Sequence, residues 1–325
     1  PLQTTKLGIS ISGMIYDSED IKKIIKKNYK DYVKFQYPLS FQILYIWQNS
    51  LAKNLDTSLI LAHLSIQALK TYNRNNKKNS FKDFIKNKEI NIGKVKKAEI
   101  SRELKIPRET VRRKLEELNK KKLIFMYDGS IKVNQKSFEI NELENILNKF
   151  SKIINLTTET LARENIVKKK NINDIDLLNN FSHSWLYILS LIVTLSLIWK
   201  KLLKSMENWF VFGVCGLNQM YNLKDSKNFK DLHYDDTENF FLNITQIETR
   251  RGLNPTTISD LSGIPRQTVI RNLKTLVKLK VIEKENKTNL FFVPKNTSQH
   301  KSIIETLENV QLAMSSNIFK MLQAI

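Results

Sequence analysis

The sequence predicts a mainly α-helical protein with small β-hairpins, in which one arrangement of elements occurs twice. The first observation is a repeated motif, because IPRETV at 106–111 matches IPRQTV at 264–269, 158 residues later. The second is a set of apolar residues at helical spacing before and after each copy, which is typical of amphipathic helices. The third is the pair Asp128-Gly129 between two apolar runs, which favours a tight β-hairpin.

The repeat sets the expected order of elements in each half of the chain. An apolar helical region and a polar connector precede the motif, and a hairpin and a closing helix follow it. The closing helices are expected over about 141–163 and from about 301 to the end, since both carry an apolar stripe. The expected N-terminal segment is 1–36, with an amphipathic helix at about 20–36. The first unit is expected over 37–165, with its motif at about 92–134, and the second over 179–325, with its motif at about 250–294. A charged linker, 166–178, is expected between the two units.

The residues of the first motif predict two helices joined by a tight turn. Ile100 and Leu104 lie four residues apart, and therefore on one face of the first helix. Pro107 is expected to open the second helix at its first position, where the missing N–H costs nothing. The expected inward stripe of the second helix is Val111, Leu115 and Leu118.

The second motif repeats this pattern with its own start signals. Asn254 is expected to cap its first helix and Pro255 to open it. The inward stripe of its second helix is Val269, Leu273 and Leu276. Its hairpin is expected over 281–293, with a longer polar tip at 286–289.

The chain is strongly basic, with 53 Lys and Arg residues against 32 Asp and Glu and a net charge of +21. A surplus of this size favours a polyanionic partner, although a chain so rich in Lys, Asn and Ile is also what an AT-rich genome encodes. Arginine is more informative, because eight of the ten arginines lie in two windows, 102–113 and 250–271. The guanidinium fork suits phosphates and the guanine edge, so the two motifs are the expected nucleic-acid contacts.

The pattern I-S-x-x-L-x-I-P-R-x-T-V-x-R-x-L, read from Ile100 and followed by a hairpin, resembles bacterial winged helix-turn-helix regulators. The order of helices, winged motif and closing helix most resembles the MarR-like family, whose members are homodimers joined through their terminal helices. The resemblance implies two winged helix-turn-helix domains related by internal duplication, flanked by helices forming a pseudo-dimer interface. The apolar segment 185–199 does not map onto this family.

By this resemblance, the second helix of each motif enters a major groove of DNA. The implied groove and phosphate contacts are Arg108, Thr110, Arg112 and Arg113 in the first copy and Arg266, Gln267, Thr268 and Arg271 in the second. The same helix faces and the hairpins add Glu109, Ile270, Lys132 and Lys287.

The two helices differ, because Ile270 stands where the first copy has Arg112, and an isoleucine suits a thymine methyl group. We therefore expect two unlike half-sites about one helical turn apart. The alternative is that these arginines only keep the surface soluble, paired within the helix with acidic residues such as Glu109 and Glu116.

Little in the sequence indicates catalysis, a cofactor or a metal. The four histidines are scattered, without a carboxylate or cysteine at ligand spacing. The single cysteine, Cys215, lies in an apolar run, and we expect it to be buried and inert, with an oxidant-sensing role as the alternative. The uncharged run 185–199 is shorter than the roughly 18–20 residues of a bilayer span, so a buried core helix is expected and a membrane segment is the alternative.

The function expected from these observations is a sequence-specific regulator of transcription that binds double-stranded DNA, using two non-identical helices in successive major grooves. It is not expected to be an enzyme, and the cytoplasm, in association with the nucleoid, is its expected location, since the start of the chain lacks a signal-peptide pattern. A plasmid-type replication initiator, a winged-helix scaffold that binds protein and a membrane-tethered regulator remain alternatives. A small-molecule effector and self-association also remain open. The aromatic residues that are candidates for an effector pocket are Trp185, Tyr187, Trp199, Trp209, Phe210 and Phe212.

Overall fold

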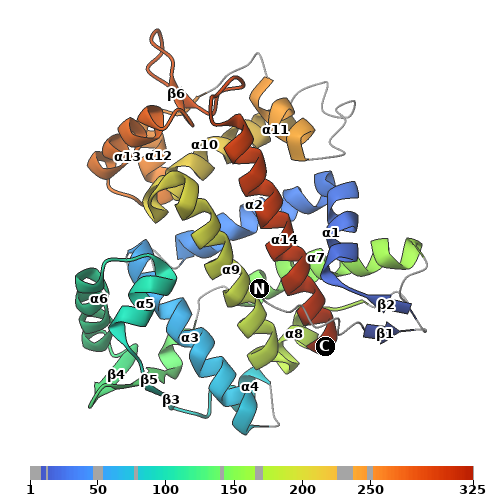
Figure 1. Cartoon of the computed structure of the whole chain (residues 1–325), viewed down its shortest axis with the longest axis vertical. Helices are drawn as coiled ribbons and strands as arrows, with labels where there is room; N and C mark the ends of the chain where they lie inside the picture. The colour runs from blue at the N-terminus through green and yellow to red at the C-terminus, as the bar shows by residue number, and fades with distance from the viewer. Residues whose placement is uncertain are drawn as a thin grey trace. The chain divides into compact units, whose positions relative to one another are not determined.

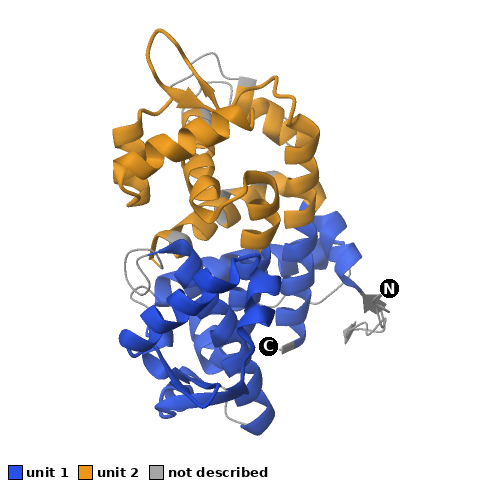
Figure 2. Ribbon diagram, turned by 60° about the vertical axis from the view of Figure 1, so that its left-hand side comes forward, with its two compact units in different colours: residues 1–25, 50–194, 311–325 blue, residues 26–49, 195–310 orange. Residues whose placement is uncertain are grey.

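The computed structural model describes residues 9–11, 14–46, 54–76, 80–139, 143–164, 171–224, 237–246 and 252–324. It is 74% helix with small antiparallel sheets, so the mainly α-helical class is confirmed (Figure 1). The chain forms two compact units (Figure 2). Unit 1 comprises Pro1–Ile25, Ser50–Thr194 and Gln311–Ile325, and unit 2 comprises Lys26–Asn49 and Leu195–Val310.

Each unit is built from separate stretches of chain, whereas the expected ranges 37–165 and 179–325 are contiguous. Helix α2 (Tyr29–Ile46) belongs to unit 2 with the later residues. There Phe41 packs against Trp209 and Phe210, with ring centroids 5.7 Å apart in both pairs. Helices α9 (Phe181–Leu203) and α14 (His300–Ala324) contribute residues to both units. The order of elements along the chain therefore does not reveal which of them share a core.

Unit 1 surrounds helix α3, which packs against the first motif. Phe84 lies at the centre of its aromatic cluster, with ring centroids 4.8 Å from those of Tyr72 and Phe138 and 5.3 Å from that of Phe181. The contacts with Tyr72 and Phe138 are edge-to-face, an arrangement that adds to the stabilisation from buried apolar surface. The elements that lie wholly or mainly in unit 1 are β1 (Ile9–Ile11), β2 (Met14–Tyr16), α1 (Ser18–Lys27), α3 (Leu55–Asn75), α4 (Phe81–Phe84), β3 (Glu89–Lys94), α5 (Lys97–Leu104), α6 (Arg108–Lys120), β4 (Ile124–Tyr127), β5 (Ser130–Asn134), the 3-10 turn η2 (Gln135–Phe138), α7 (Leu143–Arg163) and α8 (Asp174–Asn179).

Unit 2 surrounds helix α10 in a similar way, since α10 contacts both helices of the second motif and its hairpin. The elements that lie wholly in unit 2 are α2, α10 (Met206–Lys224), α11 (Thr237–Gln246), α12 (Pro255–Ser262), α13 (Arg266–Lys278), β6 (Glu283–Lys284) and β7 (Phe291–Phe292). In unit 1, the corresponding helix α3 contacts α5, α6, β3 and β5. In both units, a buried helix supports the motif that follows it along the chain.

The two closing helices are confirmed as α7 and α14, but two other expectations need correction. The amphipathic helix expected at 20–36 is interrupted at Asn28, between α1 and α2. The expected linker 166–178 is partly structured, because Asn173 and Asp176 form a capping box that begins α8. Asn155 also holds Ile172 through two hydrogen bonds of 2.7 and 2.8 Å. Residues 165–170 lie outside the described part of the chain.

Helix α9 contains the apolar run 185–199 and, at 23 residues, is longer than the uncharged run alone suggests. It is the one helix of the described residues that is long and apolar enough to cross a membrane by length and composition. Half of its most apolar window is buried within the protein, and Trp185, Ile188 and Trp199 are each at most 3% exposed. The hydroxyl groups of Ser190 and Thr194 both donate to backbone carbonyls within the helix. This burial is compatible with a soluble protein.

Candidate nucleic-acid interface

The first motif consists of α5 and α6 joined by a tight turn. Lys105 ends α5 in the left-handed conformation, with φ 51° and ψ 46°. Pro107 caps the start of α6 in an extended conformation rather than occupying its first turn, so the expected position is wrong by one residue. The stripe that packs inward is confirmed, since Ile100, Val111 and Leu115 are at most 1% exposed.

A three-stranded antiparallel sheet with strand order β3-β5-β4 belongs to the same motif; β3 precedes α5, and β4 and β5 follow α6. The expected hairpin is confirmed as β4 and β5, whose tip residues Asp128 and Gly129 have φ values of 46° and 77°. Positive φ at both positions is the geometry that makes an Asp-Gly pair favourable in a two-residue turn. Strand β3 was not expected, although the alternation of Ile90 and Ile92 with polar residues is a strand signal.

The second motif has the same helix bounds at a constant offset. α12 and α13 begin at 255 and 266, each 158 residues after α5 at 97 and α6 at 108, and they end at the same offset. The left-handed positions match as well, because Gly263 stands for Lys105 and Lys280 for Lys122. Asn254 caps α12 by accepting a hydrogen bond from the Thr257 backbone N–H at 2.9 Å, and Pro255 is its first residue, both as expected.

The second hairpin differs from the first in the length of its tip. Met126 pairs with Ile131 in the first hairpin, and Lys284 pairs with Phe291 in the second. The returning strand is therefore displaced by two further residues, and the exposed Lys287 lies in the longer tip. Leu253 forms an additional antiparallel bridge to Phe291. Phe291 belongs to β7, which pairs with β6 on its other side.

The residues expected to contact DNA lie at the surface of these motifs. Those on α6 and α13 are exposed apart from the partly exposed Thr110, Thr268 and Ile270. In the hairpins, Lys132 is partly exposed and its ammonium group pairs with Glu89. Arg266 donates from Nε to Thr256 Oγ1 at 3.1 Å. Within the described part of the chain, Arg108, Arg113 and Arg271 have no ion-pair partner.

Arg112 is held by two carboxylates of its own helix. Its Nε donates to both carboxylate oxygens of Glu109 at 3.0 Å, its Nη2 lies 2.5 Å from Glu109 Oε1, and its Nη1 donates to Glu116 Oε1 at 2.6 Å. The hydrogen bond from Arg112 lowers the pKa of the Glu109 carboxyl group. The intrahelical pairing named as the alternative for these arginines is therefore found for Arg112.

The face of α13 has none of these three groups. Gln267, Ile270 and Lys274 stand at the positions of Glu109, Arg112 and Glu116. α13 carries four basic residues and no acidic one, whereas α6 carries five basic and three acidic residues. The shared arginines are Arg108 with Arg266 and Arg113 with Arg271.

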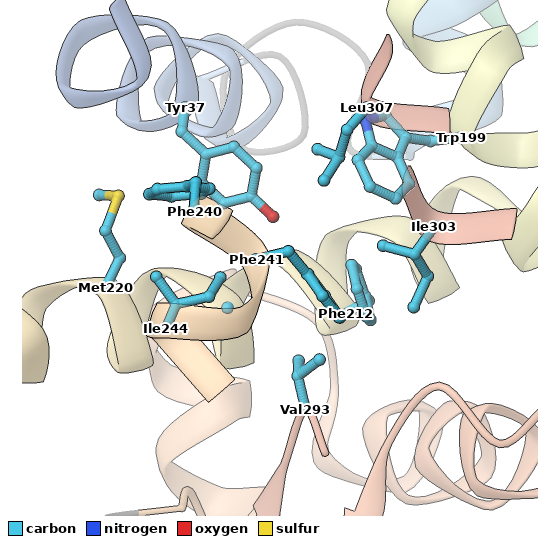
Figure 3. Close-up of a pocket in the computed structure, with 11 residues that line it drawn as sticks. Tyr37, Trp199, Phe212, Met220, Phe240, Phe241, Ile244, Val293, Ile303 and Leu307 are labelled. Atoms are coloured by element: carbon cyan, nitrogen blue, oxygen red, sulfur yellow. The ribbon is translucent and has the colours of Figure 1, made fainter. Parts of the chain in front are cut away.

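Unit 2 also contains a small apolar pocket (Figure 3). Of the candidate aromatic residues, Trp199 and Phe212 line it, while Trp209 and Phe210 pack against Phe41 instead. The Tyr37 hydroxyl group points towards the middle of these side chains (Figure 3), and burial raises its pKa. The remaining lining residues are Gly216, Met220, Phe240, Phe241, Ile244, Val293, Ile303 and Leu307.

This pocket lies beside the second hairpin. The side-chain amide of Gln219 on α10 accepts from the Val293 backbone N–H at 2.8 Å and donates to its carbonyl at 3.0 Å. Val293 itself lines the pocket and directly follows β7. Gln219 thus links α10, the pocket wall and the end of the hairpin.

Other reactive groups in the described residues are few. Cys215 is 1% exposed, and burial raises the pKa of its thiol to about 12. His63 Nδ1 lies 3.6 Å from Glu103 Oε2. No group of three or more His, Cys, Asp or Glu residues in the part of the chain that the structure describes is placed to hold a metal ion.

The chain matches no family model, and neither a curated protein nor a solved structure shows significant similarity to it.

Proposed function

We propose that this protein is a sequence-specific regulator of transcription that binds double-stranded DNA through two winged helix-turn-helix modules. In this proposal α5, α6 and the β3-β5-β4 sheet form the first module, and α12, α13 and the β6-β7 hairpin form the second. α6 and α13 are the recognition helices, which lie in major grooves with their N-terminal residues against the bases. The two hairpins are the wings.

The observation that carries the proposal is the constant offset of 158 residues between the helices of the two motifs, joined to their common surface chemistry. Both recognition helices place an arginine at the first position and another at the sixth, and all four side chains are exposed. Internal duplication explains the offset. Retention of both arginine pairs on a solvent-facing surface supports a shared polyanionic ligand.

The MarR-like resemblance also suggests roles for the closing helices and for a small-molecule partner. The closing helices α7 and α14 would form the pseudo-dimer interface, so that one chain supplies both DNA-reading modules. The resemblance also allows a small-molecule effector, for which the apolar pocket of unit 2 is the candidate site. We further propose that the protein acts in the cytoplasm in association with the nucleoid, with self-association left as a secondary property.

The decisive experiment is fluorescence anisotropy with random and selected duplexes across a series of salt concentrations. We expect tight, steeply salt-dependent binding with a sequence preference. The double variant R108A/R266A should lose that preference, because the first residue of each recognition helix is removed. The matched control is R74A/K301A, which removes two exposed charges elsewhere on the chain. Weak binding that responds equally to both variants would contradict the proposal and favour a protein-binding role for the modules.

A plasmid-type replication initiator remains the second candidate, because such proteins also carry tandem winged helices. Mapping of bound sites in genomic DNA separates the two functions. Repeated direct sites at an origin would favour the initiator, and single sites near promoters would favour the regulator.

A further inference from the structure

The recognition faces of α6 and α13 differ in a concerted way. Among the first, second, fifth, sixth and ninth residues of each helix, which lie on the outward face, the arginines at the first and sixth positions are the same. The other three positions, held by Glu109, Arg112 and Glu116 in α6, all change. These three residues are the members of one hydrogen-bonded cluster, so α13 lacks the arginine together with both of its partners.

The cluster leaves Arg112 able to bind a base. A guanidinium group has five N–H donors, and the bonds to the two carboxylates use one each on Nε, Nη1 and Nη2. One N–H on each terminal nitrogen remains, so Arg112 keeps two donors of the kind that guanine O6 and N7 accept. The carboxylates meanwhile hold the side chain in one orientation, which lowers the entropy lost on binding.

Glu109 can also contact a base directly. Its side chain is 75% exposed near the start of α6, where residues of a recognition helix reach base edges. A carboxylate accepts a hydrogen bond from the N4 amino group of cytosine and repels phosphate and the acceptor edge of thymine. The pair Glu109 and Arg112 therefore suits neighbouring cytosine and guanine bases.

The face of α13 suits a different sequence. Gln267 has the donor and acceptor of an amide, which match N6 and N7 of adenine. Ile270 is partly exposed on the same face and offers only apolar contact, which suits the methyl group of thymine. Lys274 adds a positive charge that fits phosphate.

We infer that α6 reads a half-site containing G·C pairs and α13 reads a half-site of A·T pairs, with Glu109 and Glu116 acting as positioning residues for Arg112. This inference rests on the proposed function, since it assigns base preferences to the two recognition helices. It identifies Glu109, Arg112, Gln267 and Ile270 as the residues that make the two half-sites differ, whereas Arg113 and Arg271 supply affinity.

The test is selection of binding sites from a random duplex library with the full-length protein and two exchange variants. E109Q/R112I/E116K gives α6 the face of α13, and Q267E/I270R/K274E gives α13 the face of α6. The parent should select one G·C-containing and one A·T half-site. The first variant should select A·T pairs in both, and the second should select G·C pairs in both. Exchange of a preferred pair should weaken binding by roughly 5- to 150-fold.

Two results would overturn the inference while leaving the proposed function intact. One is a parent protein that selects the same base composition in both half-sites. The other is an unchanged preference in both exchange variants that bind DNA with parental affinity at low salt. Loss of all duplex binding by the parent would instead overturn the proposed function and the inference together. Circular dichroism of each variant confirms that the exposed substitutions preserve the helices.

Discussion

Lys105 and Gly263 end equivalent helices in the same left-handed region of the backbone, with φ values of 51° and 69°. A lysine in this region has its Cβ close to the following carbonyl oxygen, whereas glycine has no Cβ. The sharp turn between the two helices of each motif is thus kept in both copies, but only one copy has the residue best suited to it. The pair offers an internal comparison of backbone strain.

Replacement of Lys105 by glycine should raise the free energy of unfolding by about 0.5–1 kcal/mol, because relief of the steric cost exceeds the extra entropy lost by glycine. The reciprocal variant, Gly263→Lys, should lower it by a similar amount. Urea denaturation followed by circular dichroism measures both changes. A loss of stability in K105G would show that the lysine side chain makes a contribution that the turn geometry does not explain.

Gly213 on α10 allows the close approach of Phe41 in unit 2. A Cβ atom at position 213 would lie 1.6 Å from Phe41 Cζ, so Gly213→Ala forces the ring or the helix to move. We expect the free energy of unfolding to fall by about 1–3 kcal/mol. Gly216→Ala is the matched control on the same helix, since its nearest neighbour would be the Tyr37 hydroxyl at 3.2 Å. Equal effects of the two substitutions would contradict this explanation.

The raised pKa of Cys215 predicts a thiol that does not react in the folded protein. With a pKa of about 12, the thiolate fraction at pH 8 is on the order of 10⁻⁴. Labelling with a thiol reagent such as a disulfide dye should be undetectable within minutes at pH 8 and complete after denaturation in guanidinium chloride. Rapid labelling of the native protein would revive the alternative that Cys215 senses oxidants.

The lowered pKa values of two histidines predict that the free energy of unfolding decreases in mild acid. Burial lowers the pKa of His63, against a smaller opposing effect of Glu103, and burial also lowers the pKa of His183. The unfolded chain therefore binds protons that the folded chain does not, beginning near the unperturbed pKa of about 6.5. The free energy of unfolding should be greatest above that pH and fall as the pH decreases towards the lower folded pKa values.

The double variant H63Q/H183Q tests the origin of this pH dependence. Its unfolding free energy should change less between pH 7.5 and pH 5.5 than that of the parent protein, whatever its absolute stability. An unchanged slope would assign the effect to other groups.

Arg113 and Arg271 should contribute to DNA affinity without contributing to base selection. Both are exposed at the sixth position of their helices, where we place them against phosphates. Each substitution to alanine should reduce the slope of log affinity against log salt by about 1 and weaken binding to all sequences equally. A change in the selected sequence would instead identify the altered arginine as a base contact.

The sequence predicts the elements of the two motifs well because their signals are local. Pro107, Asn254 and the Asp128-Gly129 tip act within a few residues of themselves, so the helix starts and the first hairpin can be located to within a residue or two. The apolar stripe of Val111 and Leu115 likewise depends only on helical periodicity. Exposure of the candidate DNA contacts follows directly, since they lie opposite that stripe.

The sequence does not predict contacts between distant elements. Nothing in the residues of α2 indicates that Phe41 packs against Trp209, more than 160 positions later. The apolar pocket cannot be predicted from the sequence for the same reason, because its lining residues come from α2, α9, α10, α11 and α14. The pairing of Arg112 with Glu109 and Glu116 could be anticipated from the i, i+3 and i, i+4 spacing of these residues. Only the structure shows which guanidinium nitrogens form the hydrogen bonds.

The three differences between the faces of α6 and α13 have a consequence for orientation. A homodimer presents two identical faces and cannot distinguish one end of its site from the other. If the two motifs read DNA as proposed, a DNA sequence that fits both would fit them in only one order, because Glu109, Arg112 and Glu116 occur in one motif and not in the other. The protein would then bind such a site in one direction along the DNA.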